Sequence, residues 1–234
     1  MDFEKGEVLL FDKPRKWTSF DLVRKIRFVT RVKKVGHAGT LDPLATGLLI
    51  LCTGKKTKEI DQIQGQEKEY TGEFFLGATT PCFDREQPVD REFPVDHITP
   101  EMIREAAATL TGRIEQLPPP FSAVKVGGKR AYELARAGKE VPIEPRMVEV
   151  KEFEITSVEM PLVGFRIVCS KGTYIRTLAN DLGKKLGAGA YLYNLRRTRI
   201  GNFRVEDAWD LDAFMVAAKA ARKPQPADDQ GTDQ

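Results

Sequence analysis

Histidine and cysteine are scarce in this chain of 234 residues, which contains two His and three Cys. Cys52, Cys82 and Cys169 are odd in number, far apart in the chain and form no CxxC pair. This pattern argues against a disulfide framework and against a zinc site. The two histidines, His37 and His97, are too few for a histidine metal cluster. We therefore expect reduced thiols and chemistry that needs no bound metal.

Long apolar runs are also missing. No stretch approaches the length of a membrane span, and the first ten residues lack the basic and apolar blocks of a signal peptide. We therefore expect a cytoplasmic protein with no membrane partner. The 41% of hydrophobic residues suffices for a buried core, and the length fits one large domain or a domain with an embedded lobe.

Acidic residues are almost absent from residues 22–58, where Asp42 is the one acid among nine Lys and Arg. Residues 184–204 carry six bases and no acid, whereas residues 84–105 carry seven acids and three bases. The net charge of the whole chain is only +3, so the two signs are separated along the sequence. Separate blocks favour a nucleic-acid face and a solvated opposite face, although a single charge run is more often ordinary solvated surface.

Asp42 belongs to a distinctive loop sequence, GHAGTLDPLATG, at residues 36–47. Its glycines and small residues predict an ordered tight loop, because glycine permits backbone conformations that side chains forbid. Pro43 biases Asp42 toward an extended conformation, so the carboxylate is expected to point away from the loop. An isolated Asp before Pro is usually just a turn residue, but the basic surroundings favour a site for an anionic partner.

The hydrophobic pattern predicts an α+β fold, because strand and helix signals do not alternate regularly. Thr18 and Asp21 form a capping box for a helix that buries Leu22 and Ile26, and Thr99 with Pro100 marks a second helix start. The second helix is expected to stop at Gly112. A third helix carries a stripe of Ile175, Leu178, Leu182 and Leu186. Strands are predicted at residues 7–11, 48–52, 68–76, 148–155, 163–169 and 191–199.

The loop of Asp42 resembles the catalytic loop of the TruB family of tRNA pseudouridine synthases, whose pattern is GHxGTLDPxATG. Five further segments resemble that family in the same order along the chain. They are GEVLLFDKPRKWTS at residues 6–19, KEYTGEFFLGATTPCFD at 68–84, PPPFSAVKVGGKRAYELARAG at 118–138, CSKGTYIRTLANDLG at 169–183 and LRRTRIGNF at 195–203. The resemblance therefore covers most of the chain.

The resemblance implies the pseudouridine synthase fold, a long mixed and mostly antiparallel sheet with flanking helices and a central RNA-binding cleft. It implies a catalytic domain over residues 1–216, with an RNA-gripping insertion at about residues 94–145. Residues 217–234 are polar and predicted to be a disordered tail. Only 22 residues follow Asp212, so we expect a short form without the C-terminal PUA domain that many members carry.

The family pattern also implies roles for individual residues. Asp42 takes the catalytic position, and Arg176, in the string GTYIR, is expected to hold this carboxylate charged and oriented through a planar two-donor contact. Tyr70 is implied to stack on the flipped base and to assist proton transfer. The implied substrate-binding residues are Tyr174 and Leu195 in the uridine pocket, His37 beside the loop, and Lys13, Lys58 and Lys125 at phosphates. Without the resemblance, each would have an ordinary structural or solvated role.

The implied function is the isomerisation of uridine 55 in the T loop of tRNA to pseudouridine, without a cofactor. Asp42 could attack C1′ or abstract a ribose proton, and the sequence leaves both routes open. The expected partner is the T-arm stem-loop, with no guide RNA and a monomeric protein as the default. A guide-RNA-dependent relative of the same fold and an RNA-folding module that mainly remodels tRNA are the alternatives.

Overall fold

The computed structural model of the protein describes residues 1–119, 121–122, 124–126, 128–131, 134 and 142–220. Its main sheet consists of β1 (Val8–Lys13), β2 (Val35–His37), β3 (Thr46–Thr53), β4 (Lys68–Leu76), β7 (Gly112–Gln116), β10 (Arg146–Glu159), β11 (Leu162–Cys169), β12 (Ala190–Ile200) and β13 (Phe203–Arg204). Seven of these strands follow the order β1-β3-β12-β4-β11-β10-β7. Strand β2 pairs with β3 and β13 with β12, and the pairing of β12 with β3 is parallel while the other strand pairs are antiparallel.

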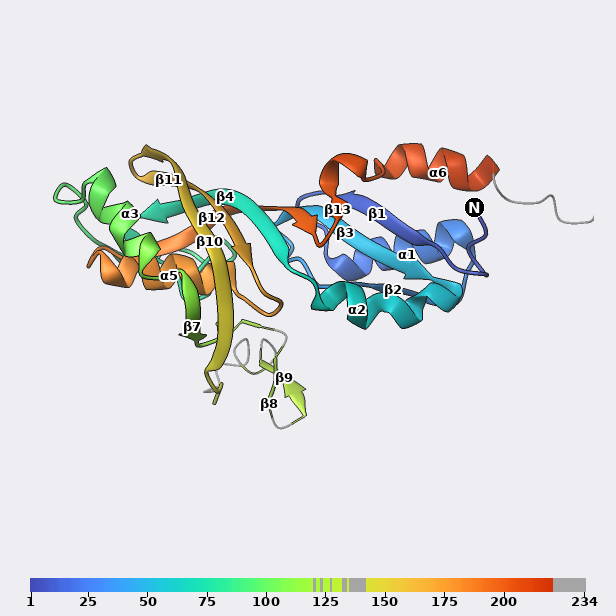
Figure 1. Ribbon diagram of the computed structural model, residues 1–234, viewed down its shortest axis with the longest axis horizontal. Helices are drawn as coiled ribbons and strands as arrows, with labels where there is room; N and C mark the ends of the chain where they lie inside the picture. The colour runs from blue at the N-terminus through green and yellow to red at the C-terminus, as the bar shows by residue number, and fades with distance from the viewer. Residues whose placement is uncertain (120, 123, 127, 132–133, 135–141, 221–234) are drawn as a thin grey trace, which may run out of the picture.

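Helices cover this sheet in two groups. The α-helices are α1 (Ser19–Thr30), α2 (Ile60–Gly65), α3 (Pro100–Ala108), α5 (Ile175–Lys185) and α6 (Leu211–Ala220). Figure 1 shows α1, α2 and α6 around β1, β2 and β3 in one half, and α3 and α5 with β7, β10 and β11 in the other. Strands β4 and β12 connect the two halves (Figure 1). None of the helices in the described residues has the length and apolar character needed to cross a bilayer.

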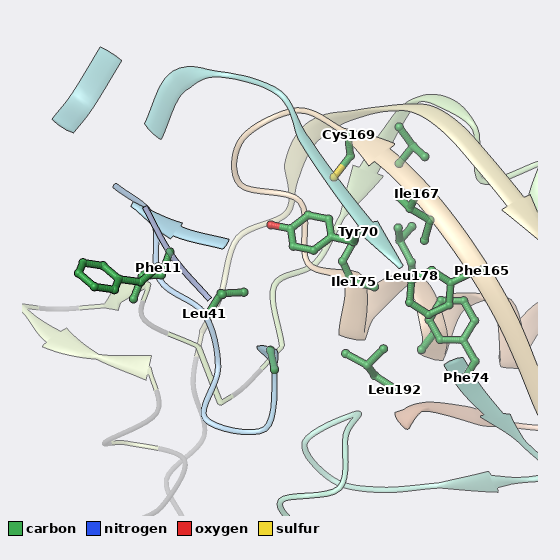
Figure 2. Packing of buried hydrophobic residues seen from close by; sticks show 14 of the residues in the cluster. Phe11, Leu41, Tyr70, Phe74, Phe165, Ile167, Cys169, Ile175, Leu178 and Leu192 are labelled. Atoms are coloured by element: carbon green, nitrogen blue, oxygen red, sulfur yellow. The ribbon is translucent and has the colours of Figure 1, made fainter. Parts of the chain in front are cut away.

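The main hydrophobic cluster runs along the sheet through both halves. Phe74 of β4 and Phe165 of β11 stack with ring centroids 4.1 Å apart, and Leu178 of α5 packs in the same cluster (Figure 2). Tyr70 lies at the edge of this cluster, and Figure 2 shows its hydroxyl turned toward the side where Leu41 lies. Leu41, which precedes Asp42 in the loop, belongs to the same cluster, so the core reaches the loop that carries Asp42.

The capping signals in the sequence are confirmed. Thr18 caps α1 in a complete capping box with Asp21, and Thr99 caps α3 with Pro100 in the first turn. The apolar stripe of α5 is buried, and strands form in all six predicted regions. Strand β2, helix α2 and the 3-10 helix η1 (Gly54–Glu59) were not predicted, because these short segments lack a periodic apolar pattern.

The predicted end of the second helix was wrong. Helix α3 ends at Ala108, and Gly112, expected as its stop, has φ of +95° and begins β7. Both α3 and β7 belong to the body of the molecule, since β7 pairs with β10 and Ile103 of α3 is fully buried. The first part of the predicted insertion is therefore sheet and core, and much of residues 120–141 lies outside the described residues.

The first residues of the predicted C-terminal tail belong to a helix. Helix α6 continues through Ala220, and Ala218 is fully buried against the main cluster. Ala218 therefore packs on the body, whereas Lys219 and Ala220 are exposed at the end of the helix. Residues 221–234, the remainder of the predicted tail, lie outside the described residues.

Gly47 sits where the backbones of β3 and β12 meet most closely. The parallel pairing places Arg197 opposite Gly47, whose φ is +98°. A Cβ atom on Gly47 would lie 2.3 Å from the carbonyl oxygen of Arg197, closer than real contacts allow. Glycine is therefore required at this position both for its backbone conformation and for the approach of the two strands.

We predict that Gly47→Ala lowers the free energy of unfolding by at least about 3 kcal/mol, because it combines a disfavoured φ with a backbone clash. The control is Gly65→Ala in α2, where an added Cβ meets no atom within 4 Å. This control should be neutral or stabilising by up to about 1 kcal/mol. Chemical denaturation measures both changes, and equal stabilities of the two variants would contradict the prediction.

Candidate active site

The loop between β2 and β3 forms one wall of a cavity of about 650 Å³. Residues 39–42 contribute the loop side, Lys68 and Tyr70 come from β4, and the segment leading into α5 closes the opposite side. Strand β2 precedes the loop and pairs antiparallel with β3, the strand that follows the loop. This pairing holds the two ends of the loop together. Asp42 is thus presented to the cavity from a loop whose ends cannot move apart.

Arg197 of β12 fixes this loop through hydrogen bonds to backbone carbonyls. Its side chain is buried, and its three guanidinium nitrogens donate to three backbone carbonyls: Nε to Leu48 at 2.8 Å, Nη1 to Thr40 at 3.3 Å and Nη2 to Gly39 at 3.0 Å. A buried guanidinium is expensive unless its donors are satisfied, so these contacts fix the loop and the strand together. Arg197 belongs to the basic block of residues 184–204 that was predicted to be a surface, so its buried role was not predicted.

Lys13 of β1 also bonds to the backbone of this loop. It is fully buried, and its Nζ donates to the carbonyls of Pro14 at 3.0 Å, Trp17 at 2.7 Å and Pro43 at 3.4 Å. Burial lowers the pKa of Lys13 to about 8, against the opposing effect of the nearby Asp42 charge. The expectation that Lys13 contacts phosphates was wrong, because the ammonium is enclosed by backbone carbonyls.

Asp42 and Arg176 meet at the cavity, as the sequence predicted. Arg176 Nε lies 3.0 Å from Asp42 Oδ2, with 6% of the Arg176 side chain exposed against 39% of the Asp42 side chain. The expected planar two-donor contact is not formed, because Nη1 donates to the carbonyl of Cys82 at 3.2 Å and Nη2 to that of Phe121 at 3.0 Å. The guanidinium is therefore anchored by backbone and presents one edge to the carboxylate.

A second carboxylate, Asp84, lies beside the same guanidinium. Its Oδ2 is 3.6 Å from Arg176 Nε, and the residue is buried. Its Oδ1 accepts from the Cys82 thiol at 2.9 Å and from the Glu86 amide at 2.8 Å, which fixes the carboxylate's orientation. Asp84 was counted only within the acidic, solvated block, so its place in the site was missed. Its position at the end of the family-like segment 68–84 was the available signal.

Tyr70 projects from the middle of the sheet into the cavity. It stands opposite Ile167 of β11 and Arg197 of β12, and it is buried. Burial raises the pKa of the Tyr70 phenol, with Arg197 acting in the opposite direction. At neutral pH the hydroxyl is therefore protonated and can donate a hydrogen bond.

Tyr174 and Leu195 line the cavity, as predicted. Tyr174 precedes α5, and the Gln116 side chain both accepts from its amide at 2.7 Å and donates to its carbonyl at 3.1 Å. The Arg146 guanidinium lies over the Tyr174 ring, 4.6 Å from the ring centroid. The cavity lining therefore includes an aromatic ring with a cation beside it.

His37 and Lys58, two further predicted binding residues, lie outside the cavity lining. His37 ends β2 directly before the loop, and burial together with Arg197 lowers the pKa of its imidazole. Lys58 is exposed on η1 and does not line the cavity. Lys125 begins the short strand β8 (Lys125–Val126), which pairs with β9 (Lys129–Arg130), but its side chain lies outside what the structure describes.

Residues 184–204 do not form one basic face. Arg196 and Arg199 alternate with the buried Arg197 along β12 and pair with acids, Arg196 with Asp12 at 2.6 Å and Arg199 with Glu67 at 2.8 Å. Lys184 and Lys185 are exposed in the last turn of α5. The block was therefore wrongly interpreted as a continuous RNA surface, because strand alternation separates Arg196 from Arg197 and the irregularity between Arg197 and Arg199 turns Arg199 away from Arg197.

Comparisons with known proteins agree with this fold and site. Residues 27–175 match the family model described as TruB family pseudouridylate synthase (N terminal domain), and residues 176–229 match tRNA pseudouridylate synthase B C-terminal domain. A protein of Flavobacterium johnsoniae named tRNA pseudouridine synthase B is 51% identical over 91% of this chain and 96% of its own length. A protein of Phocaeicola vulgatus with the same name is 52% identical over 92% of this chain and 94% of its own length.

Solved structures show the same architecture. The structure titled "Crystal Structure of a Cbf5-Nop10-Gar1 Complex" superposes with a TM-score of 0.70 at 28% identity over 92% of this chain, and this chain spans about half of that one (54%). A mixed sheet that carries a loop carboxylate beside a buried arginine thus defines a pseudouridine synthase. Within that class, the chain belongs to the TruB family of pseudouridylate synthases.

We predict that Arg176→Lys lowers turnover by about 100-fold or more, because a compact ammonium cannot occupy the three separate positions from which Nε, Nη1 and Nη2 of the planar guanidinium reach Asp42 and the two carbonyls. Release of tritium from RNA labelled at uridine C5 measures turnover, since the C5 hydrogen leaves when C5 bonds to C1′. The matched control is Arg104→Lys, an exposed residue 3.7 Å from Glu101. Near-normal turnover of the Arg176 variant would remove this guanidinium from the active site.

We predict that Lys13→Met lowers the free energy of unfolding by about 1–3 kcal/mol, because the carbonyls around Lys13 lose a buried donor. In the wild type, the Lys13 pKa falls from 10.5 to about 8 on folding, so the folded chain releases this proton first. Wild-type stability should therefore rise from pH 8 to 10.5 by an amount that the variant lacks. Lys68, whose pKa burial also lowers to about 8, is common to both proteins. Parallel curves of stability against pH would contradict this account.

Proposed function

We propose that this enzyme converts uridine 55 in the T loop of tRNA to pseudouridine, and that it does so by base flipping without a cofactor. The observation that carries the proposal is the exposed edge of Asp42, held against the buried Arg176 on the wall of the 650 Å³ cavity. The names of the Flavobacterium and Phocaeicola relatives support tRNA as the substrate. The basic segment around Asp42 supports a polyanionic substrate of this kind.

The reaction rearranges one nucleotide and leaves its atoms in balance. The bond between N1 and C1′ breaks, the uracil turns, a bond forms between C5 and C1′, and the C5 proton leaves while N1 gains a proton. Asp42 acts at the sugar, either by attack on C1′ or by removal of a ribose proton. Both routes require a carboxylate with a free oxygen facing the substrate, and the half-exposed Asp42 side chain supplies one.

The other cavity residues suit a flipped uridine. Extracting a stacked base costs a few kcal/mol, which contacts in the pocket must offset. Tyr70 offers a ring for stacking and a protonated hydroxyl, while Tyr174 and Leu195 provide apolar walls. Lys68 is buried at the cavity, and its Nζ donates to the carbonyl of Gln66 at 2.6 Å. His37, directly before the loop, would support the RNA at the cavity's edge.

The later part of the predicted insertion is the candidate for gripping RNA. Its described residues contact the site. The Phe121 carbonyl accepts from Arg176 Nη2, and Val124 lines the cavity. At the start of the segment, the Leu117 carbonyl accepts from the Thr177 hydroxyl at 3.2 Å. A segment joined in this way to the arginine of the site can link RNA binding with the geometry at Asp42. We propose residues 117–145 for this role in place of residues 94–145.

The site is tested first by Asp42→Asn. We expect tritium release to fall by at least about 1,000-fold, because the amide keeps the size of the side chain but loses the charge that both routes need. Binding of a T-arm stem-loop should remain within a few fold of wild type. The control is Asp12→Asn, which removes a carboxylate paired with Arg196 away from the cavity. Near-normal release from the Asp42 variant would remove it from catalysis.

Substrate choice is tested with purified protein, with no guide RNA and no second protein. Release from an isolated T-arm stem-loop labelled only at uridine 55 supports the proposal. Release only after addition of a guide RNA would instead favour the alternative of a guide-RNA-dependent enzyme of the same fold. Faster tRNA refolding without any release would favour an RNA-folding module.

A further inference from the structure

The outward face of α1 combines aromatic and cationic side chains. Phe20, Arg24, Arg27, Phe28 and Arg31 recur at intervals of four, three, one and three residues, which places them on one side of the helix and at its C-terminal cap. All five are exposed, with exposed fractions of 58% for Phe20 and 80% for Phe28. We call these five residues the α1 platform.

The two phenylalanines do not serve the packing of the helix. The opposite side of α1 is buried through Leu22, Val23 and Ile26, which belong to the main hydrophobic cluster, whereas Phe20 and Phe28 belong to neither cluster. Scattered exposed apolar residues are normal on protein surfaces. Here two aromatic rings share one face with three arginines, and the Arg24 guanidinium carbon lies 5.7 Å from the centroid of the Phe20 ring.

The charge of the platform is strongly one-sided. Asp21 is the acid of α1, and it is already bound to the Thr18 amide and hydroxyl in the capping box while it pairs with Arg24. Its pKa is lowered to about 2, mainly by its hydrogen bonds with Thr18. The arginines therefore present net positive charge to an approaching polyanion.

The platform starts beside the catalytic loop. Ser19, the neighbour of Phe20, accepts from the Leu41 amide at 2.9 Å and donates to the Leu41 carbonyl at 3.2 Å, so the start of α1 is bonded to the residue preceding Asp42. Lys13 also joins the Trp17 and Pro43 carbonyls at this place. From there α1 runs within the half that contains β1, β2 and β3 (Figure 1). Phe28 follows Phe20 by about 12 Å along the helix, since the rise is about 1.5 Å per residue.

We propose that the α1 platform binds the part of the RNA substrate that lies outside the cavity, with Phe20 and Phe28 stacking on unpaired bases and the arginines contacting phosphates. The inference rests on the proposed function, because it places the platform next to the nucleotide held at Asp42. Looped RNA is the occupant that the chemistry favours, because its splayed bases can stack on aromatic rings, whereas a regular duplex exposes mainly phosphates and 2′-hydroxyls.

The stacking contribution is tested with the double variant Phe20→Ala and Phe28→Ala. The dissociation constant for a T-arm stem-loop and KM should each rise about fivefold or more, while kcat at saturating RNA is retained. The matched control is Val216→Ala on α6, which removes an apolar side chain with a similar exposure of 70%. The variant Phe28→Trp keeps an aromatic surface and should retain tight binding. Unchanged affinity in the double alanine variant would overturn the stacking role.

The charge contribution is tested with Arg24→Gln combined with Arg27→Gln. Loss of two phosphate contacts should reduce the slope of log affinity against log salt by about 1.4 to 1.8. The control is the double variant Arg196→Gln and Arg199→Gln, because these arginines are paired with Asp12 and Glu67 and lie outside the platform. An equal change of slope in the control would show that the effect reflects net charge alone and would overturn the assignment to α1.

Position is tested independently of affinity by a photo-crosslinking amino acid at residue 28 and, as control, at residue 216. Crosslinking of a T-arm stem-loop from residue 28 alone supports the platform. Binding of α1 to vesicles of anionic lipid, or self-association lost in the double alanine variant, with no RNA crosslink, would overturn it. Wild-type tritium release separates the two proposals: no release refutes the proposed function, whereas normal release with no crosslink refutes the platform alone.

Discussion

The geometry of this candidate site depends on a guanidinium buried under the loop that carries Asp42. Arg197 donates to the carbonyls of Gly39, Thr40 and Leu48, on both sides of Asp42 in the chain. A loop rich in glycine loses much conformational entropy when it is ordered, so it needs strong contacts to hold one shape. The parallel pairing of β12 with β3 brings Arg197 there, and the close approach at Gly47 makes that pairing possible. The order of the strands therefore determines where Arg197 lies and, through it, the shape of the loop.

Two buried cations hold the loop, and a third faces the substrate side. Lys13 and Arg197 use their donors on backbone carbonyls, so their charges stabilise the shape of the loop. Arg176 also uses two nitrogens on carbonyls, but its Nε faces Asp42 and Asp84. Asp84 is buried, whereas Asp42 is partly exposed to the cavity. Asp84 thus belongs to the buried surroundings of Arg176, whereas Asp42 remains accessible from the cavity.

The parts of this site that could be predicted were those with a local signal. The loop sequence around Asp42, the string that ends at Arg176 and the cap formed by Thr18 and Asp21 are all short and contiguous, and the structure places them as expected. Lys13, Asp84 and Arg197 were misjudged because charge in a sequence does not reveal burial. Along β12, neighbouring arginines point to opposite faces, so one run of bases contains both a buried clamp and surface ion pairs.

The contact between Arg176 and Asp42 is short but poorly aligned. Their atoms lie 3.0 Å apart, yet within the described residues Arg176 Nε is buried and forms no hydrogen bond of normal geometry. Catalytic hydrogen bonds are often loose without substrate and tighten in the complex. Because the terminal nitrogens are fixed by the Cys82 and Phe121 carbonyls, the guanidinium has little freedom, and alignment must come from the Asp42 side chain. Phe121 belongs to the segment proposed to grip RNA, so this segment is bonded directly to the arginine that faces Asp42.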